Sequence, residues 1–150
     1  MIDVIIKNIW TIVGSILLAC FTAHLFWRHF QKTRRLNAAD KFSQIIHTEF
    51  KGLYPIPTNW PEHSSDIVPV LRQKFPILSE AVSEYSRFVK DKKGFQSAWD
   101  LYRFGDKDTA NGQQDYFQYT GAYFDNEEPP NPQKVFKKNI DRLLSYCEKT

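Results

Sequence analysis

The chain has 150 residues, of which 42% are hydrophobic and 25% are charged, and its formal net charge is +3. That length suits one domain of ordinary size. Residues 37–150 hold 15 Lys or Arg against 16 Asp or Glu, which argues against a nucleic-acid-binding domain, so we expect no nucleic acid as a partner.

An uncharged segment near the N-terminus predicts a transmembrane helix. Residues 8–27, between Lys7 and Arg28, hold no Asp, Glu, Lys or Arg. A helix of that length is about 30 Å long, which matches the hydrocarbon core of a bilayer. Trp10 and Trp27 lie near its two ends, where indole rings prefer the headgroup boundary.

The residues after this segment predict its orientation. Four of them are basic: Arg28, Lys32, Arg34 and Arg35. Positive residues beside a span tend to stay in the cytoplasm, so we expect residues 1–7 outside and residues 37–150 inside. The basic juxtamembrane segment, residues 28–36, can attract anionic lipid headgroups. Together with Trp10 and Trp27, the four basic residues form the predicted interface with the bilayer.

The two cysteines do not predict a disulfide, because Cys20 lies in the apolar segment and Cys147 lies near the C-terminus. Residues 17–20, Leu-Leu-Ala-Cys, also resemble a bacterial lipoprotein processing box, in which Cys20 would be lipidated and the domain exported. Against this, the apolar run continues to Trp27 and basic residues follow. The exported lipoprotein is the alternative to a single-pass protein of the bacterial inner membrane.

Residues 37–150 predict a mostly α fold, a soluble bundle of about five short helices around an aromatic-rich core. The spacing of apolar residues places the helices at 36–53, 66–74, 76–92, 95–104 and 132–147. Three prolines in residues 54–61 end the first of them. Residues 114–124 fit the periodicity of a helix or a strand, and both possibilities stay open.

Local residue types predict where these helices begin and end. Residues 64–66, Ser-Ser-Asp, form a good N-terminal cap for the second helix. Pro76 is expected to start the third helix and Gly94 to end it. Gly105 is expected to close the fourth helix, and Asn131 to cap the last.

The sequence holds no phosphate-binding glycine loop and no metal-ligand motif. Residues 62–66, Glu-His-Ser-Ser-Asp, contain the residue types of a hydrolytic triad, but consecutive residues of one loop seldom converge. Residues 106–112 echo a calcium loop, but Ala110 and Phe117 stand at ligand positions. We therefore predict no catalytic, metal or cofactor site and no cofactor.

Aromatic residues are the remaining candidates for function. Most are expected in the core, but Trp and Tyr dominate binding hot spots, so some could form an interaction surface. The candidates are Tyr54, Trp60, Tyr116, Tyr119 and Tyr123.

Three short patterns resemble a known group of proteins. They are Gly52-Leu53-Tyr54-Pro55-Ile56-Pro57 with Trp60-Pro61, Phe95 with Trp99 and Tyr102, and Asn131-Pro132-Gln133-Lys134. Over most of residues 38–146 the chain looks like a group of short, uncharacterised bacterial single-pass membrane proteins with no assigned activity. The resemblance implies a bacterial inner membrane and lends no catalytic residues.

The leading hypothesis is a membrane-anchored helical interaction or assembly domain that binds another protein and catalyses no reaction. One alternative is a membrane-associated enzyme with a site outside known motifs, at His63 with Asp66 or around residues 116–123. Another is a membrane-acting effector or toxin that oligomerises through the apolar helix.

Overall fold

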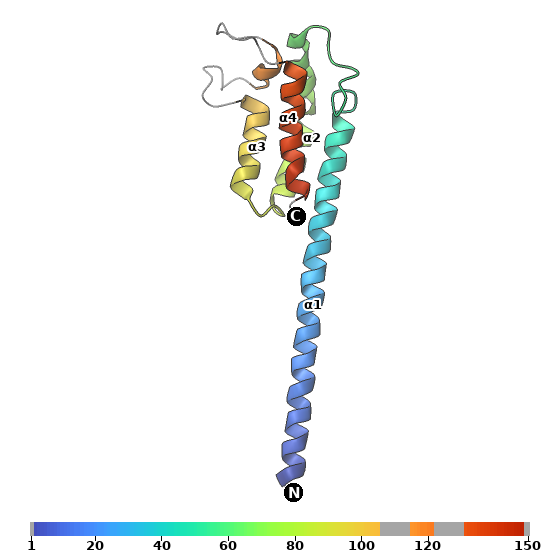
Figure 1. Cartoon of the computed structure of the whole chain (residues 1–150), viewed down its shortest axis with the longest axis vertical. Coiled ribbons are helices and arrows are strands. Elements are labelled where there is room, and N and C mark those ends of the chain that lie inside the picture. The colour runs from blue at the N-terminus through green and yellow to red at the C-terminus, as the bar shows by residue number, and fades with distance from the viewer. Residues whose placement is uncertain (1, 106–114, 122–130, 149–150) are drawn as a thin grey trace. The chain divides into compact units, whose positions relative to one another are not determined.

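A computed structural model describes the backbone of residues 2–105, 115–121 and 131–148, and the side chains from residue 12 onward within those ranges (Figure 1). These residues form four α-helices and two short 3-10 helices, and no strand. The predicted mostly α fold class is therefore confirmed. The chain divides into two compact units, Met1–Leu36 and Asn37–Thr150, and each is described by itself below.

The first unit consists of the greater part of helix α1, Ile2–Glu49. No proline interrupts this helix, and no charged residue occurs between Lys7 and Arg28. The hydroxyls of Ser15 and Thr22 donate to carbonyls of the preceding turn, at 2.8 and 2.9 Å, so neither side chain needs another partner. Within the described residues this is the one helix long and apolar enough to cross a membrane, and a signal sequence meets the same criterion.

The second unit is a helical bundle built from the C-terminal part of α1 with α2, Ile67–Ser86, α3, Lys92–Phe104, and α4, Pro132–Glu148. The 3-10 helices are η1, Ser64–Asp66, and η2, Phe117–Tyr119. Helix α3 packs on α4 and on α2, and η2 packs on α4 (Figure 1). Each helix buries one apolar stripe, as the sequence predicts; on α1 the stripe includes Phe42, Ile46 and Phe50.

The bundle has one helix fewer than predicted, because α2 runs straight through Pro76. Proline removes one backbone donor and crowds the preceding turn. The apolar stripe nevertheless continues across it, since Leu71, Leu78 and Tyr85 recur every seven residues and are all buried. Their burial outweighs the one lost hydrogen bond. The helix then ends at Ser86, earlier than the predicted Lys92.

Gly94 was expected to end a helix, but it lies in the first turn of α3. The carboxylate of Asp91 caps this helix by accepting a hydrogen bond from the Gly94 nitrogen at 2.9 Å. A Cβ atom at Gly94 would meet that carboxylate and the Tyr146 hydroxyl. Glycine is thus required here by close approach. Gly105, with a φ of 77°, closes α3 as predicted.

The two predicted N-terminal caps have different outcomes. Asn131 caps α4 as expected, because its side-chain oxygen accepts from the Gln133 and Lys134 nitrogens at 2.9 and 3.3 Å. Residues 64–66 instead form η1, and α2 begins at Ile67 without a side-chain cap. Residues 117–119 form a 3-10 helix, which decides part of the open stretch 114–124; residues 114 and 122–124 lie outside the described residues.

We expect Asn131→Ala to lower the free energy of unfolding by about 1 kcal/mol, because it removes the acceptor for two backbone donors of α4. Thermal unfolding of the full chain in detergent, followed by circular dichroism, measures this loss. Lys138→Ala, at an exposed position of the same helix, is the matched control and should change little. Equal effects of the two substitutions would contradict the capping role.

Candidate functional site: an exposed apolar helix and a buried polar cluster

The apolar part of α1 exposes large hydrophobic side chains on every side. The exposed ones are Ile12, Val13, Ile16, Leu17, Leu18, Phe21, Leu25, Phe26, Trp27 and Phe30. At 3.6 residues per turn these positions go round the whole circumference of the helix. A helix that packs on one neighbour has a single apolar stripe, whereas this one is apolar all round. Such a surface suits a lipid environment.

Basic side chains follow this apolar surface directly. Arg28, Lys32 and Arg34 are exposed, and Arg35 is half-buried. The Arg34 guanidinium lies over the ring of Phe30, 5.7 Å from its centroid. Of the predicted interface residues, Trp27 is exposed, and the side chain of Trp10 lies outside the described side chains. Cationic side chains thus lie next to an apolar surface, an arrangement that suits the boundary of a bilayer with anionic headgroups.

The predicted aromatic interaction surface is not found. Tyr54, Tyr116 and Tyr119 are buried, and Trp60 is half-buried with its ring 5.5 Å from that of Phe136. Their rings pack in the core instead of forming an exposed patch, and the binding role assigned to them stays a prediction. Tyr123 lies outside the described residues.

Burying tyrosines requires partners for their hydroxyls, and Tyr119 has two. Its hydroxyl donates to the Tyr102 carbonyl at 2.9 Å and accepts from the Asn139 amide at 2.9 Å. Asn139 is only 4% exposed. Burial raises the pKa of Tyr119 well above its ordinary value, although the Asn139 hydrogen bond opposes the rise. Tyr119 therefore stays protonated and fastens η2 to both α3 and α4.

Tyr54 connects the proline-rich stretch to α4. Its hydroxyl donates to Asp141 at 2.7 Å, and Lys137 donates to the other carboxylate oxygen at 2.7 Å. Partial burial would raise the pKa of Asp141, but the hydrogen bonds from Lys137 and Tyr54 outweigh it and hold the pKa below its usual value. The carboxylate is thus ionised and serves as a structural acceptor.

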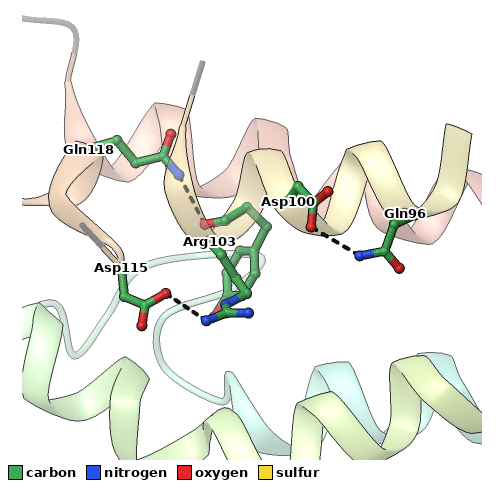
Figure 2. Close-up of polar contacts among 6 residues, drawn as sticks. Gln96, Asp100, Arg103, Asp115 and Gln118 are labelled. Carbon is green, nitrogen blue, oxygen red and sulfur yellow. Dashed lines mark hydrogen bonds and ion pairs between the residues drawn. The ribbon is translucent and has the colours of Figure 1, made fainter. Parts of the chain in front are cut away.

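Arg103 organises the C-terminal end of α3. Its guanidinium pairs with Asp115 at 2.8 Å and lies over the rings of Phe75 and Phe104, 4.5 and 4.4 Å from their centroids. Figure 2 shows this pair beside Gln118, whose amide donates to the carbonyls of Leu101 and Tyr102, at 2.7 and 2.9 Å. These carbonyls lie in the last turn of α3; that of Leu101 also accepts from the Gly105 nitrogen, at 3.0 Å, and that of Tyr102 from the Tyr119 hydroxyl, at 2.9 Å.

The residues considered for catalysis are not brought together. His63 and Asp66 are both exposed, and the side-chain hydrogen bond of this loop joins Ser65 to Asp66 at 3.4 Å. That contact orients no base toward a nucleophile. Among the described residues no group of three His, Cys, Asp or Glu could hold a metal ion. The calcium-like stretch 106–112 lies outside the described residues.

Sequence reasoning missed Arg103, Gln118 and Asn139. A signal existed for Asn139, which stands on the apolar face of α4 between Phe136 and Leu143, where a polar residue must find a buried partner. No such signal marks the other two residues, because their partners are distant in the chain or belong to the backbone.

Comparison with known proteins adds no relative to this picture. No protein-family model, curated protein or solved structure matches the chain. The chain's own residues therefore carry the functional argument.

We expect the second unit to lose stability as the pH rises above about 9. Burial raises the pKa of the Cys147 thiol from 9.0 to about 11, and that of the Tyr116 phenol from 10.0 to about 12. A group whose pKa rises on folding stabilises the folded state fully at pH values below its pKa in the unfolded chain. This contribution is lost as the pH rises from that value to the pKa in the folded state. Circular dichroism and tyrosinate absorbance against pH measure both effects.

In this titration Cys147→Ala should move the onset of destabilisation from about pH 9 to about pH 10, where the tyrosines take over. Buried tyrosines should ionise only as the protein unfolds. If every tyrosine of the folded protein ionised with the ordinary pKa of about 10, the burial of Tyr102, Tyr116 and Tyr119 would be contradicted.

Proposed function

We propose that the chain is a membrane-anchored helical interaction or assembly domain, held by residues 8–27 at the cytoplasmic face of a bacterial inner membrane. The observation that carries the proposal is the all-round exposure of large apolar side chains from Ile12 to Phe30. Soluble monomers rarely expose a contiguous apolar surface of that size, because water disfavours it. Lipid is the environment that can cover every side of the helix at once.

Two features favour an anchor over a cleaved signal sequence. The uncharged run at residues 8–27 is longer than the apolar core of a signal peptide, which spans about 7–15 residues. The polar hydroxyls within it, on Ser15 and Thr22, bond to the helix itself. In hydrocarbon such internal bonding avoids the cost of an unpaired polar group.

The basic juxtamembrane segment supports the proposed orientation and a bilayer with anionic headgroups as a partner. Each Lys or Arg near an anionic surface contributes about 1 kcal/mol of attraction. Four such residues follow the apolar run, whereas Lys7 alone precedes it. By the rule that positive flanks remain in the cytoplasm, the second unit lies on the cytoplasmic side.

The construction of the second unit favours interaction over catalysis. Its buried polar groups serve the structure, since Tyr119 with Asn139 joins η2 to α4, and the exposed Asp91 caps a helix. Exposed charges such as Lys41 and Glu84 pair with each other on its surface. These features support a role in which the surface of the second unit binds a partner protein.

We expect Leu17→Arg with Leu18→Arg to release the chain from membranes, since each arginine at the helix centre costs about 2.5–3.5 kcal/mol of insertion free energy. The measurement is extraction of membranes with alkaline carbonate, using a chain with a C-terminal reporter that is active only in the cytoplasm. Leu36→Arg, outside the apolar run, is the matched control and should stay in the membrane fraction.

In the native fusion, carbonate-resistant membrane attachment and an active reporter are expected together. An inactive reporter, together with loss of membrane attachment in Cys20→Ser, would instead support the exported lipoprotein. Release of the native chain by carbonate would overturn the anchor.

The interaction role predicts a discrete partner on one face of the second unit. A photo-reactive residue is placed at one exposed position of each helix, Glu80 on α2, Gln96 on α3 or Lys138 on α4. Irradiation of native cells should give one protein adduct from some of these positions and none from the others. Absence of a discrete adduct from every exposed position, in a chain that reaches the membrane, would contradict the proposed role.

Membrane confinement raises the local concentration of a tethered domain, so the adduct should weaken strongly in a chain without residues 1–36. An unrelated single-span anchor in place of those residues is the matched control and should restore it. An adduct that depends on the native anchor sequence would instead favour assembly through the apolar helix.

A further inference from the structure

Three buried polar atoms at the end of α3 have no hydrogen-bond partner. They are the hydroxyls of Tyr102 and Tyr116 and the Nε of Arg103. Elsewhere in the described core tyrosine hydroxyls are bonded; Tyr85 donates to the Tyr146 carbonyl at 2.9 Å, and Tyr119 has two partners. A buried polar group without a partner is costly, so a cluster of three requires an explanation.

The three residues that carry these atoms lie together at the C-terminal end of α3. The rings of Tyr102 and Tyr116 meet edge to face with centroids 5.4 Å apart, and the Tyr116 nitrogen donates to the Arg103 carbonyl at 2.6 Å. Burial raises the pKa of both phenols, while the charge of Arg103 opposes the rise in each. The two hydroxyls influence each other's pKa, yet neither makes a hydrogen bond of acceptable geometry to the other.

The backbone holds Tyr116 in this place at a cost. Its φ is 65°, in the left-handed region that a bulky side chain rarely adopts. The bond to the Arg103 carbonyl and the Arg103–Asp115 ion pair fix the residue from both sides. These contacts and the burial of the Tyr116 ring beside Tyr102 offset the strain.

Charge decides what can complete the cluster. Arg103 is already neutralised by Asp115, which lies 2.8 Å from its Nη2. A buried anion would add a negative charge beside Asp115, with only the more distant Arg72 acting on Tyr116 to oppose it, and this is unfavourable. A neutral occupant carries no such penalty. Internal waters bind in this way, with about three hydrogen bonds to buried polar groups that have no other partner.

We propose that Tyr102, Tyr116 and the Nε of Arg103 form a binding site for one neutral hydrogen-bond acceptor of the size of a water molecule. The Arg103 nitrogen and one phenol hydroxyl donate to it, and the other phenol oxygen accepts from it. The bound molecule joins the end of α3 to Tyr116 and so adds to the Arg103–Asp115 pair. This site goes beyond the proposed interaction function and does not depend on it.

The test uses the full chain in lipid nanodiscs, with Tyr102→Phe and Tyr116→Phe as the variants. Tyr119→Phe is the matched control, because its hydroxyl bonds to protein groups only among the described residues. Thermal unfolding and nuclear magnetic resonance cross-peaks between water and ring protons are the readouts. In the native protein, long-lived water cross-peaks to Tyr102 and Tyr116 are expected.

Tyr102→Phe and Tyr116→Phe should each lower the melting temperature by a few degrees and remove these cross-peaks. Tyr119→Phe should lower the melting temperature and keep them. Arg103→Lys, which retains the charge beside Asp115 but lacks Nε, should weaken them.

Opposite results would overturn the proposal in distinct ways. A rise of the melting temperature in both phenylalanine variants would mean that the hydroxyls are dry and unsatisfied. Absence of water cross-peaks in the native protein would mean that the hydroxyls bond directly to each other. A melting temperature that rises with chloride in the native protein, but not in Tyr116→Phe, would identify an anion site.

Discussion

The packing of the second unit depends on the ring of Phe136. This ring meets Phe50 of α1, Trp60 of the proline-rich stretch and Tyr119 of η2 edge to face, with centroids 5.1, 5.5 and 5.3 Å away. It also contacts Tyr102 of α3. One side chain of α4 therefore joins four segments that are distant in the sequence. A core built on such contacts gains the large buried area of aromatic rings and the preference of ring edges for ring faces.

An aromatic core that uses tyrosine rather than phenylalanine imposes a second constraint, because every buried hydroxyl needs a partner. Tyr54, Tyr85 and Tyr119 meet it with a carboxylate, a backbone carbonyl, and a carbonyl together with an amide. These bonds tie the rings to particular neighbours, so they give the core a unique arrangement that apolar packing alone would not specify. Tyr102 and Tyr116 meet the constraint only through the proposed bound molecule.

Sequence patterns predicted what is local and failed where distant contacts decide. The apolar stripes, the Asn131 cap and the closing Gly105 depend on neighbours a few residues away, and the structure has them as expected. Pro76 and Gly94 suggested helix ends, but burial of the α2 stripe and the approach of Tyr146 to Gly94 gave both residues other roles. Tyr54 and Tyr119 lie in the core, where their hydroxyls bond to groups that the sequence does not identify as neighbours. The Arg103 and Gln118 contacts depend on the path of the chain after α3.

The distribution of apolar surface also separates the two units by the solvent each one requires. Each helix of the second unit has one apolar stripe and a polar remainder, which water and a protein core can satisfy together. In the first unit, residues 12–27 expose apolar side chains all round, a surface that hydrocarbon would satisfy. The excess positive charge belongs to the basic juxtamembrane segment, whereas residues 37–150 are nearly neutral. If the chain is anchored as proposed, this positive charge faces an anionic bilayer surface, and residues 37–150 have little net charge to attract a charged partner over a long range. On the proposed function, recognition by the second unit then depends on short-range shape and hydrogen bonding, with the membrane supplying the encounter.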